Sequence, residues 1–181
     1  MRDLSRLRRN AHLPLAALAL ALARPNLGAE LGGTALVLVG LAVRAWAAGT
    51  LVKGGELCTD GPYRYVRHPL YLGSFLGALG FCVMTNSLWG WAVILPVFAL
   101  IYIAQVSAEE RWLRRQYGDA HAQWARRVPM LLPRLPGAGE GSSAAWRWSQ
   151  FLANREHYHA LITLALTVMF YLRPYWGKVG P

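Results

Sequence analysis

The sequence predicts an all-α integral membrane protein: a helical bundle of about five transmembrane helices with a pocket on the cytoplasmic side. Three observations support this fold class. The 181-residue chain is 55% hydrophobic and only 15% charged, whereas soluble domains contain about 25% charged residues. The apolar residues gather in five blocks. The basic residues, which give the chain a formal net charge of +10, lie mainly in alternate connections between these blocks.

The apolar blocks can be judged against the thickness of a membrane. They cover residues 11–23, 31–51, 69–85, 88–106 and 157–172. A helix needs roughly 20 apolar residues to cross the hydrocarbon core, within a range of about 17–25. Residues 88–106 meet this length and residues 69–85 nearly do. The first and last blocks are short, so a full crossing and a tilted or re-entrant segment both stay open for them.

The distribution of basic residues predicts the orientation. Four arginines precede the first block, three basic residues separate the second from the third, and eight arginines separate the fourth from the fifth. With five spans these segments share one side, and cytoplasmic loops are the ones rich in Lys and Arg. We therefore expect a cytoplasmic N-terminus, with the charge directed at lipid headgroups and not at nucleic acid. The first block resembles a signal peptide, but the charge pattern requires it to stay as a span.

Composition and the positions of the Pro- and Gly-rich segments divide the chain into three regions. Residues 1–52 form an N-terminal transmembrane hairpin, residues 53–136 a core of two spans with cytoplasmic helices, and residues 137–181 a linker and a final span. The excess of Arg over Lys and the abundance of Ala suggest a bacterial genome rich in G and C. We therefore expect the bacterial cytoplasmic membrane as the location.

The central region should fold as an antiparallel helical hairpin. Pro69 suits the first position of the third span, and residues 85–87 make a tight turn into the fourth. The fourth helix continues past the membrane until Gly118 breaks it, and a second helix follows that ends before Pro129. The start of the third span and the end of the fourth therefore return to the same face.

Small and charged residues inside the spans allow two interpretations each. Gly73, Gly77 and Gly80 form a stripe that favours close helix packing, although a ligand could also approach there. Arg44 lies late in the second span. We expect it to extend to the membrane surface, and a role in a functional site is the alternative.

The residues able to carry chemistry lie at one membrane face. The chain contains no HExxH, CxxC, GxSxG or GxxxxGK[ST] motif, so we expect no metal site. Arg67 and His68 directly precede the third span, while Glu109 and Glu110 follow the fourth. The hairpin should bring them together. They form either a structural ion pair that anchors the hairpin or part of an active site.

Two segments carry a resemblance to a known family. GPYRYVRHPLYLG, followed a span later by AEERWLRRQYGDAHAQWARRVPMLLPR, resembles the isoprenylcysteine carboxyl methyltransferases, integral membrane enzymes related to the phospholipid N-methyltransferases. The matching positions are Gly61, Tyr63, Arg67, His68, Pro69, Tyr71, Glu109, Glu110, Tyr117, Gly118, Val128 and Pro129. The match covers residues 56–134, and both halves occur at the family's separation.

The resemblance implies a site for S-adenosyl-L-methionine at the cytoplasmic membrane face. The implied cofactor contacts are Glu56, Leu57, Cys58, Tyr63, His68, Pro69, Leu70, Tyr71 and Glu109. Two positions depart from the eukaryotic members. Gly55 replaces a histidine, and Gln105 replaces an arginine that is associated with the substrate carboxylate. Gln105 is thus the implied substrate-binding position.

The chemistry of methyl transfer agrees with this set of residues. A cationic methyl donor held beside hydrocarbon needs a carboxylate, and Glu109 is the first candidate. Glu110 would be either a second contact or the partner of Arg114. Arg67 could clamp a carboxylate acceptor through its planar guanidinium. An amine or thiol acceptor would need a base, such as His68 or Tyr71.

The sequence therefore predicts a membrane methyltransferase with Arg67, His68, Tyr71 and Glu110 as catalytic residues. The acceptor would be a lipophilic small molecule or a lipid, with an isoprenylcysteine-type carboxylate, a phospholipid amine and a thiol all open. A catalytically silent membrane scaffold is the alternative from another class. The partners are then the bilayer and the acceptor, and the sequence predicts no oligomeric state.

Overall fold

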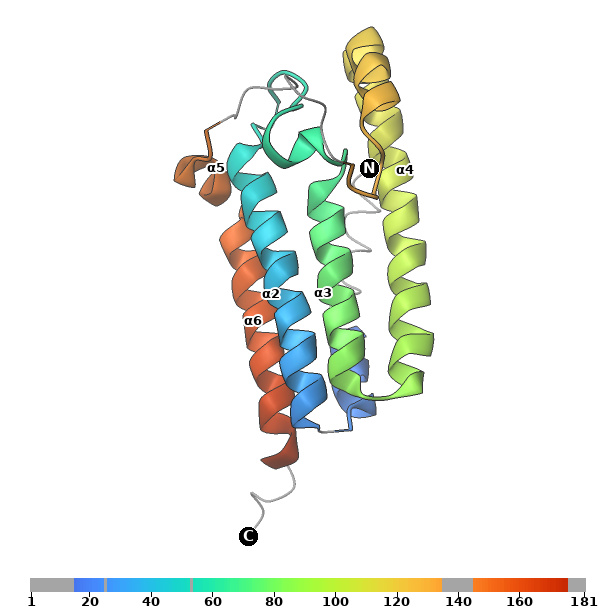
Figure 1. The fold of residues 1–181 in the computed structure, drawn as a ribbon, viewed down its shortest axis with the longest axis vertical. Helices are drawn as coiled ribbons and strands as arrows, with labels where there is room; N and C mark the ends of the chain where they lie inside the picture. The colour runs from blue at the N-terminus through green and yellow to red at the C-terminus, as the bar shows by residue number, and fades with distance from the viewer. Residues whose placement is uncertain (1–14, 25, 53, 135–144, 176–181) are drawn as a thin grey trace.

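The computed structural model describes residues 15–24, 26–52, 54–134 and 145–175, which form helices and connecting loops without a β-strand. Residues 15–22 are helical. The elements that follow are α2 (Leu27–Thr50), η1 (Gly61–Arg64), α3 (Pro69–Thr85), α4 (Leu88–Arg127), α5 (Trp148–Ala153), α6 (Glu156–Leu172) and η2 (Arg173–Tyr175). In Figure 1, α6, α2, α3 and α4 stand side by side as a bundle. The predicted all-α class is confirmed.

Among the residues that the structure describes, two helices are long and apolar enough to cross a membrane, namely α2 and α4. Only 28% and 22% of their apolar windows are buried inside the protein, so lipid is the natural cover for the remaining side chains. α3 is apolar but shorter, with 17 residues. The chain is thus an integral membrane protein. The five-span arrangement and its orientation stay predictions. Residues 1–14, which include the start of the first apolar block and the arginines before it, lie outside the described residues.

Glycines let α2 and α3 approach at backbone distance. A Cβ added to Gly40 would lie 2.5 Å from the carbonyl oxygen of Gly73, and one added to Gly33 would lie 2.5 Å from that of Gly80. The predicted packing role is therefore confirmed for Gly73 and Gly80. Gly77 differs, because a Cβ there would meet no atom within 4 Å.

The turn between α3 and α4 occurs where it was predicted. Asn86 ends α3 in the left-handed conformation, with a φ of 46°, and α4 begins at Leu88. Near the other end of α4, Gly118 has non-helical angles (φ 49°, ψ −120°). The chain then turns back alongside the end of α4 (Figure 1). The α3–α4 hairpin thus returns its two ends to one side of the bundle.

The segment after α4 is held against the loop that precedes α3. The backbone N–H groups of Arg67 and His68 donate to the carbonyl oxygens of Pro129 and Met130, at 2.9 and 3.3 Å. Further along, the N–H of Arg134 donates to the carbonyl of Tyr65 at 2.9 Å. These bonds fix the backbone at the start of α3, and thereby the direction of the side chains there.

The C-terminal helices close the bundle against α2. Asn154 Nδ2 donates to the carbonyls of Ala48 and Leu51, at 2.7 and 2.8 Å, which satisfies the free C-terminal carbonyl groups of α2. The short helix α5 was not predicted. The predicted linker, residues 133–145, lies mostly outside the described residues. Residues 157–172, predicted as the last span, are helical in α6, and their crossing of a membrane stays a prediction.

The expectation that Arg44 extends to the membrane surface is wrong. Its Nε and Nη2 donate to the two carboxylate oxygens of Glu156, at 2.5 and 2.9 Å. Its Nη1 donates to the carbonyl of Leu70 and to Ser74 Oγ. Because a carboxylate at the start of α6 lies opposite, the guanidinium finds its counter-charge inside the bundle and joins α2, α3 and α6.

Candidate active site

The predicted residues from the two ends of the hairpin meet around Glu110. Arg67 Nη1 donates to Glu110 Oε2 at 2.5 Å, and His68 Nε2 donates to Glu110 Oε1 at 2.7 Å. The three side chains are largely withdrawn from water, with exposed fractions of 11% for Arg67, 3% for His68 and 14% for Glu110. Arg67 and not Arg114 is therefore the ion-pair partner of Glu110.

The pKa of Glu110 reflects this environment. Burial raises it, but the hydrogen bond from His68 and the positive charge of Arg67 outweigh burial, so the pKa lies below its ordinary value. Glu110 is thus an ionised carboxylate whose charge is compensated by its neighbours. The arrangement serves as an anchor between the two helix ends and leaves little net charge on Glu110.

Glu109 has a different set of neighbours, although it is adjacent in sequence. It accepts a hydrogen bond from the hydroxyl of Tyr71 at 2.6 Å, and within the described part of the chain it forms no salt bridge. The Tyr71 ring in turn contacts the Tyr102 ring edge-on, with centroids 5.5 Å apart. The Tyr71 phenol carries no positive charge, so Glu109 lacks the cationic partner that Glu110 has.

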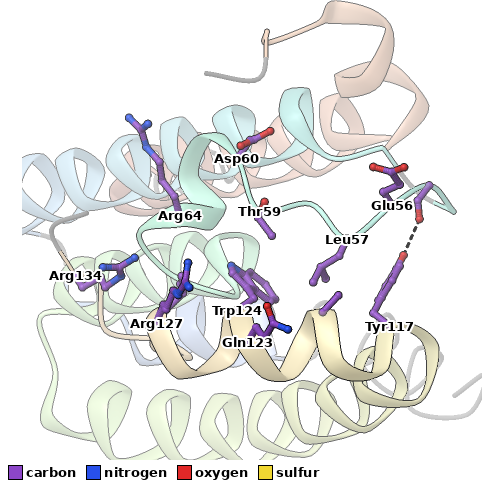
Figure 2. Close-up of a pocket in the computed structure, with 13 residues that line it drawn as sticks. Glu56, Leu57, Thr59, Asp60, Arg64, Tyr117, Gln123, Trp124, Arg127 and Arg134 are labelled. Carbon is purple, nitrogen blue, oxygen red and sulfur yellow. Dashed lines mark hydrogen bonds between the residues drawn. The ribbon is translucent and has the colours of Figure 1, made fainter. Parts of the chain in front are cut away.

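Arg67, His68, Tyr71, Glu109 and Glu110 together form the cluster at the end of the hairpin. A cavity of about 880 Å³ lies beside this cluster, between the loop before η1 and the last turns of α4. Figure 2 shows loop residues such as Glu56 and Leu57 on one wall, with Tyr117 and Trp124 opposite. The Tyr117 hydroxyl donates to the carbonyl of Gly55 at 2.8 Å, which ties the walls together. The volume is in the range of small-molecule sites.

The predicted cofactor contacts divide between cavity and cluster. Glu56 and Leu57 line the cavity. His68, Tyr71 and Glu109 belong to the cluster, and Pro69 and Leu70 form the first turn of α3 beneath it. Glu109 is not among the residues that line this cavity, so the two groups of predicted contacts do not share it.

Two further predicted contacts, Cys58 and Tyr63, lie in the packing between cavity and helices. They pack with Ala47, Trp124 and Val128. Burial raises the pKa of the Cys58 thiol, and burial together with the nearby Cys58 raises that of Tyr63 well above its ordinary value. Both side chains are therefore neutral at physiological pH. The Tyr63 hydroxyl has no hydrogen-bond partner within the described ranges.

Gln105, the predicted substrate-binding position, lies one turn before Glu109 on α4. Its side-chain oxygen is buried and has no hydrogen-bond partner in the described segments. A buried acceptor without a donor costs free energy, and a ligand with an N–H or O–H group would satisfy it. An amide oxygen does not attract a carboxylate as an arginine would.

Comparison with known proteins relates this chain to two groups of methyltransferases. The phospholipid methyltransferase model matches residues 31–120, a stretch that holds α2, α3 and both glutamates. A protein-S-isoprenylcysteine O-methyltransferase of Schizosaccharomyces pombe is 35% identical over 114 residues, 61% of this chain and 47% of that protein. The chain is therefore similar to the phospholipid methyltransferases and to the isoprenylcysteine carboxyl methyltransferases.

Other relatives carry different names. The cobalt-zinc-cadmium resistance protein CzcN of Cupriavidus metallidurans is 42% identical over 57% of this chain and 47% of its own length. Methanethiol S-methyltransferase 2 of Bradyrhizobium diazoefficiens is 36% identical over 48% of this chain and 32% of its own length. The chain thus spans less than half the length of these relatives. No solved structure matches it.

One residue that lies beside Glu110 was missed by the sequence prediction. His121 is 1% exposed, and its Nε2 lies 3.5 Å from Glu110 Oε2. Neither ring nitrogen has a hydrogen-bond partner among the residues described. No local motif marks His121. Only the break at Gly118, which turns the chain back, could have placed it near Glu110.

The stability of the protein should fall on acidification in two steps. Burial lowers the pKa of His121 from 6.5, and the charges of Arg67 and Arg114 lower it further against the opposing charge of Glu110. A group whose pKa is lower in the folded state binds more protons when unfolded, so stability rises with pH. The loss due to His121 therefore begins below pH 6.5, and that due to Glu110 begins below its ordinary 4.5.

Melting temperatures measured in lipid nanodiscs between pH 4 and 8 would test these two steps. His121→Gln should flatten the upper step and leave the lower one. Asp119→Asn, which removes an exposed charge nearby, is the control and should leave both. A melting temperature that rises as the pH falls from 7 to 5 would contradict the assignment.

Proposed function

We propose that the chain transfers a methyl group from S-adenosyl-L-methionine to a lipophilic acceptor at the cytoplasmic face of the membrane. The single observation behind this proposal is the contrast between the two adjacent glutamates. Glu110 is neutralised by Arg67 and His68, whereas Glu109 is held by a phenol alone. The site thus offers one uncompensated carboxylate at the edge of an apolar bundle.

The residues fit the cofactor in charge and in shape. S-adenosyl-L-methionine supplies a methyl group activated by a sulfonium sulfur, and it also carries an ammonium group that S-adenosylhomocysteine retains. A cation beside hydrocarbon needs a counter-charge. Glu109 would provide it. The neighbouring cavity offers Tyr117 and Trp124 as apolar walls and Glu56 as a second acidic group, which suits a ligand with an aromatic base and a cationic end.

The chain's own contribution to catalysis would be positioning and exclusion of water. The first turn of α3 is fixed by the bonds from Arg67 and His68 to the segment after α4, so Tyr71 and Glu109 are held in one geometry. Rigid alignment of donor and acceptor provides much of the rate of such transfers. The apolar side of the bundle keeps water from the reacting atoms.

Two acceptor classes fit best. An isoprenylcysteine-type carboxylate is suggested by the name of the Schizosaccharomyces pombe relative. A thiol is favoured by a specific observation, because Arg67 already forms the ion pair with Glu110 and Gln105 replaces an arginine. Neither residue then offers a free cation for a carboxylate. A thiol must lose its proton, and the Tyr71 hydroxyl with its partner Glu109 would be the group to accept it.

Binding of S-adenosylhomocysteine to the full chain in nanodiscs, measured by isothermal titration calorimetry, tests the proposal. Glu109→Ala should weaken binding by about 10- to 100-fold, the usual loss for a hydrogen bond to a charged group. Asp119→Ala removes a carboxylate from the exposed part of α4 and should leave binding unchanged.

The alternative of a silent scaffold predicts a different result. If the cluster only anchors the hairpin, the intact protein will bind no S-adenosylhomocysteine, and the proposal fails. If binding occurs, labelled cofactor offered with membrane lipid extracts, prenylcysteine analogues and small thiols will identify the acceptor. Base hydrolyses a methyl ester but not an S-methyl or N-methyl product. Base treatment of the labelled product then distinguishes transfer to a carboxylate from transfer to a thiol or amine.

A further inference from the structure

An aromatic segment, residues 145–155, lies beside the C-terminal end of α2 and includes α5 (Figure 1). Three of its rings contact one another. The Trp148 ring meets those of Trp146 and Phe151 edge-on, with centroids 4.7 and 5.5 Å apart. Arg155 then adopts the left-handed conformation, with a φ of 58°, so α5 does not continue into α6 as one helix. The segment is therefore a separate unit at this end of the bundle.

A glycine of α2 provides the place where this segment is attached. A Cβ added to Gly49 would overlap Nε1 of Trp146, so the indole occupies the space that a side chain would need. The indole N–H donates to the carbonyl of Ala45 at 2.9 Å, and the backbone N–H of Arg147 donates to that of Gly49 at 3.0 Å. Together with the bonds from Asn154 to the same helix end, these contacts fix the segment against α2.

The outward side of the segment is apolar and basic. Trp148 and Leu152 are 67% and 50% exposed, and because they are four positions apart they share one face of α5. Arg147 and Arg155 are exposed as well, and neither forms an ion pair with a residue that the structure describes. The segment contains no acidic residue, and the carboxylate that follows it, Glu156, is bound inside the bundle. Two uncompensated positive charges thus lie beside exposed apolar side chains.

The position of the segment in the bundle favours lipid as its partner. Only 28% of the apolar window of α2 is buried, so lipid covers most of this helix, and the segment continues that surface at the helix end. Tryptophan is enriched where hydrocarbon meets the headgroups, and basic side chains near this layer are attracted to anionic lipids. The same helix end carries Ala47, which packs with Tyr63 near the candidate active site. The segment and the site therefore lie on the same side of the bundle.

We propose that residues 145–155 form an interfacial anchor that binds anionic phospholipid headgroups. Trp148 and Leu152 enter the border of the hydrocarbon layer, and Arg147 and Arg155 contact the phosphates. Because the segment is bonded to the end of α2, this contact sets the depth of the neighbouring site relative to the headgroups. The inference goes beyond the proposed function and does not depend on it.

Photolabelling by lipids tests the proposal on the full chain. The protein is placed in phosphatidylcholine nanodiscs that contain a small fraction of one of two probes. These are a phosphatidylglycerol and a phosphatidylcholine, each with a diazirine at the same acyl carbon close to the glycerol. Mass spectrometry then locates the labelled peptides. Residues 145–155 should be labelled by the phosphatidylglycerol probe about tenfold or more above the phosphatidylcholine probe, as two basic residues near the surface predict.

Matched variants assign this preference to the segment. Arg147→Gln combined with Arg155→Gln should remove the preference for phosphatidylglycerol and leave labelling by phosphatidylcholine unchanged. Arg111→Gln combined with Arg115→Gln is the control, since it removes two exposed charges from α4 and should leave the preference at residues 145–155 intact. Trp148→Ser should lower labelling of the segment by both probes, because the apolar anchor is lost.

Salt provides a measurement that needs no variant. Raising the ionic strength shortens the range of attraction between exposed charges, so the preference of the wild-type protein for phosphatidylglycerol should decrease. Labelling by phosphatidylcholine should not change.

Three results would overturn the inference. Absence of label from residues 145–155 while the exposed side of α2 is labelled would show that the segment faces water. Equal labelling by the two probes would show that the headgroup charge is not recognised. A preference that survives loss of both arginines would assign the recognition to another part of the chain. Labelling as expected without any binding of S-adenosylhomocysteine would instead refute the proposed function alone.

Discussion

Replacing Glu110 by alanine is expected to lower the free energy of unfolding by about 3–5 kcal/mol, the usual cost of leaving a buried charge without its partner. Arg67 and His68 both bind this carboxylate, and both are largely withdrawn from water. Loss of Glu110 would leave the Arg67 guanidinium in an apolar corner with His68 and His121 beside it. The start of α3 would then separate from the end of α4.

Glu109→Gln is the matched control for this prediction. It changes the neighbouring carboxylate, which accepts a single hydrogen bond from Tyr71, so the free energy of unfolding should change by about 1 kcal/mol or less. Denaturant unfolding in detergent micelles, followed by tryptophan fluorescence, measures both variants. The assignment is wrong if Glu109→Gln destabilises the protein more than Glu110→Ala does.

This pair of variants also separates the two interpretations of the cluster. An anchor and a ligand site would use the same cluster of side chains, and the ion pair of Arg67 with Glu110 favours Glu110 as the anchor. If Glu109 serves the cofactor, Glu109→Gln will retain stability and lose binding, while Glu110→Ala will lose both. If the cluster is only an anchor, binding will be absent throughout and stability alone will change.

The fold of the central region could be predicted because its signals are local. Pro69 begins α3, Asn86 in the left-handed conformation ends it, and the predicted bounds of residues 69–85 agree with the helix. The break at Gly118 likewise appears as a positive φ of 49°. Proline, asparagine and glycine restrict the backbone at their own positions, so their effect does not depend on distant contacts.

The core of the site followed from topology. An antiparallel hairpin of fixed turn length must return Arg67 and His68 to Glu109 and Glu110, about 40 residues away in sequence, since α-helices have a constant rise per residue. Which glutamate pairs with Arg67 was not predictable. That choice depends on the side-chain directions of two adjacent helical residues, which differ by about 100°.

Contacts that involve the chain after Gly118, or the C-terminal helices, could not be predicted. His121 reaches Glu110 only because the helix is interrupted and the chain turns back. Arg44 and Glu156 are 112 residues apart, and nothing near either residue indicates the other. Burial of an arginine in a span is expensive, and the sequence alone does not show whether water or a distant carboxylate offsets that cost.

Arg44→Met should lower the free energy of unfolding by about 3–5 kcal/mol, because it leaves the Glu156 carboxylate, which is 7% exposed, without a counter-charge. Glu156→Leu should cost a similar amount for the converse reason. The double variant should be more stable than either single one, since two apolar side chains of similar size can replace a buried ion pair with little loss.

A double-mutant cycle of unfolding free energies measures this coupling directly. Additive effects of the two substitutions would mean that both charges reach water in the folded protein, and the expectation of an extended Arg44 would be restored. Strong coupling would show that the pair holds α6 against α2 and α3. Arg44→Met should then loosen α6 and leave S-adenosylhomocysteine binding intact.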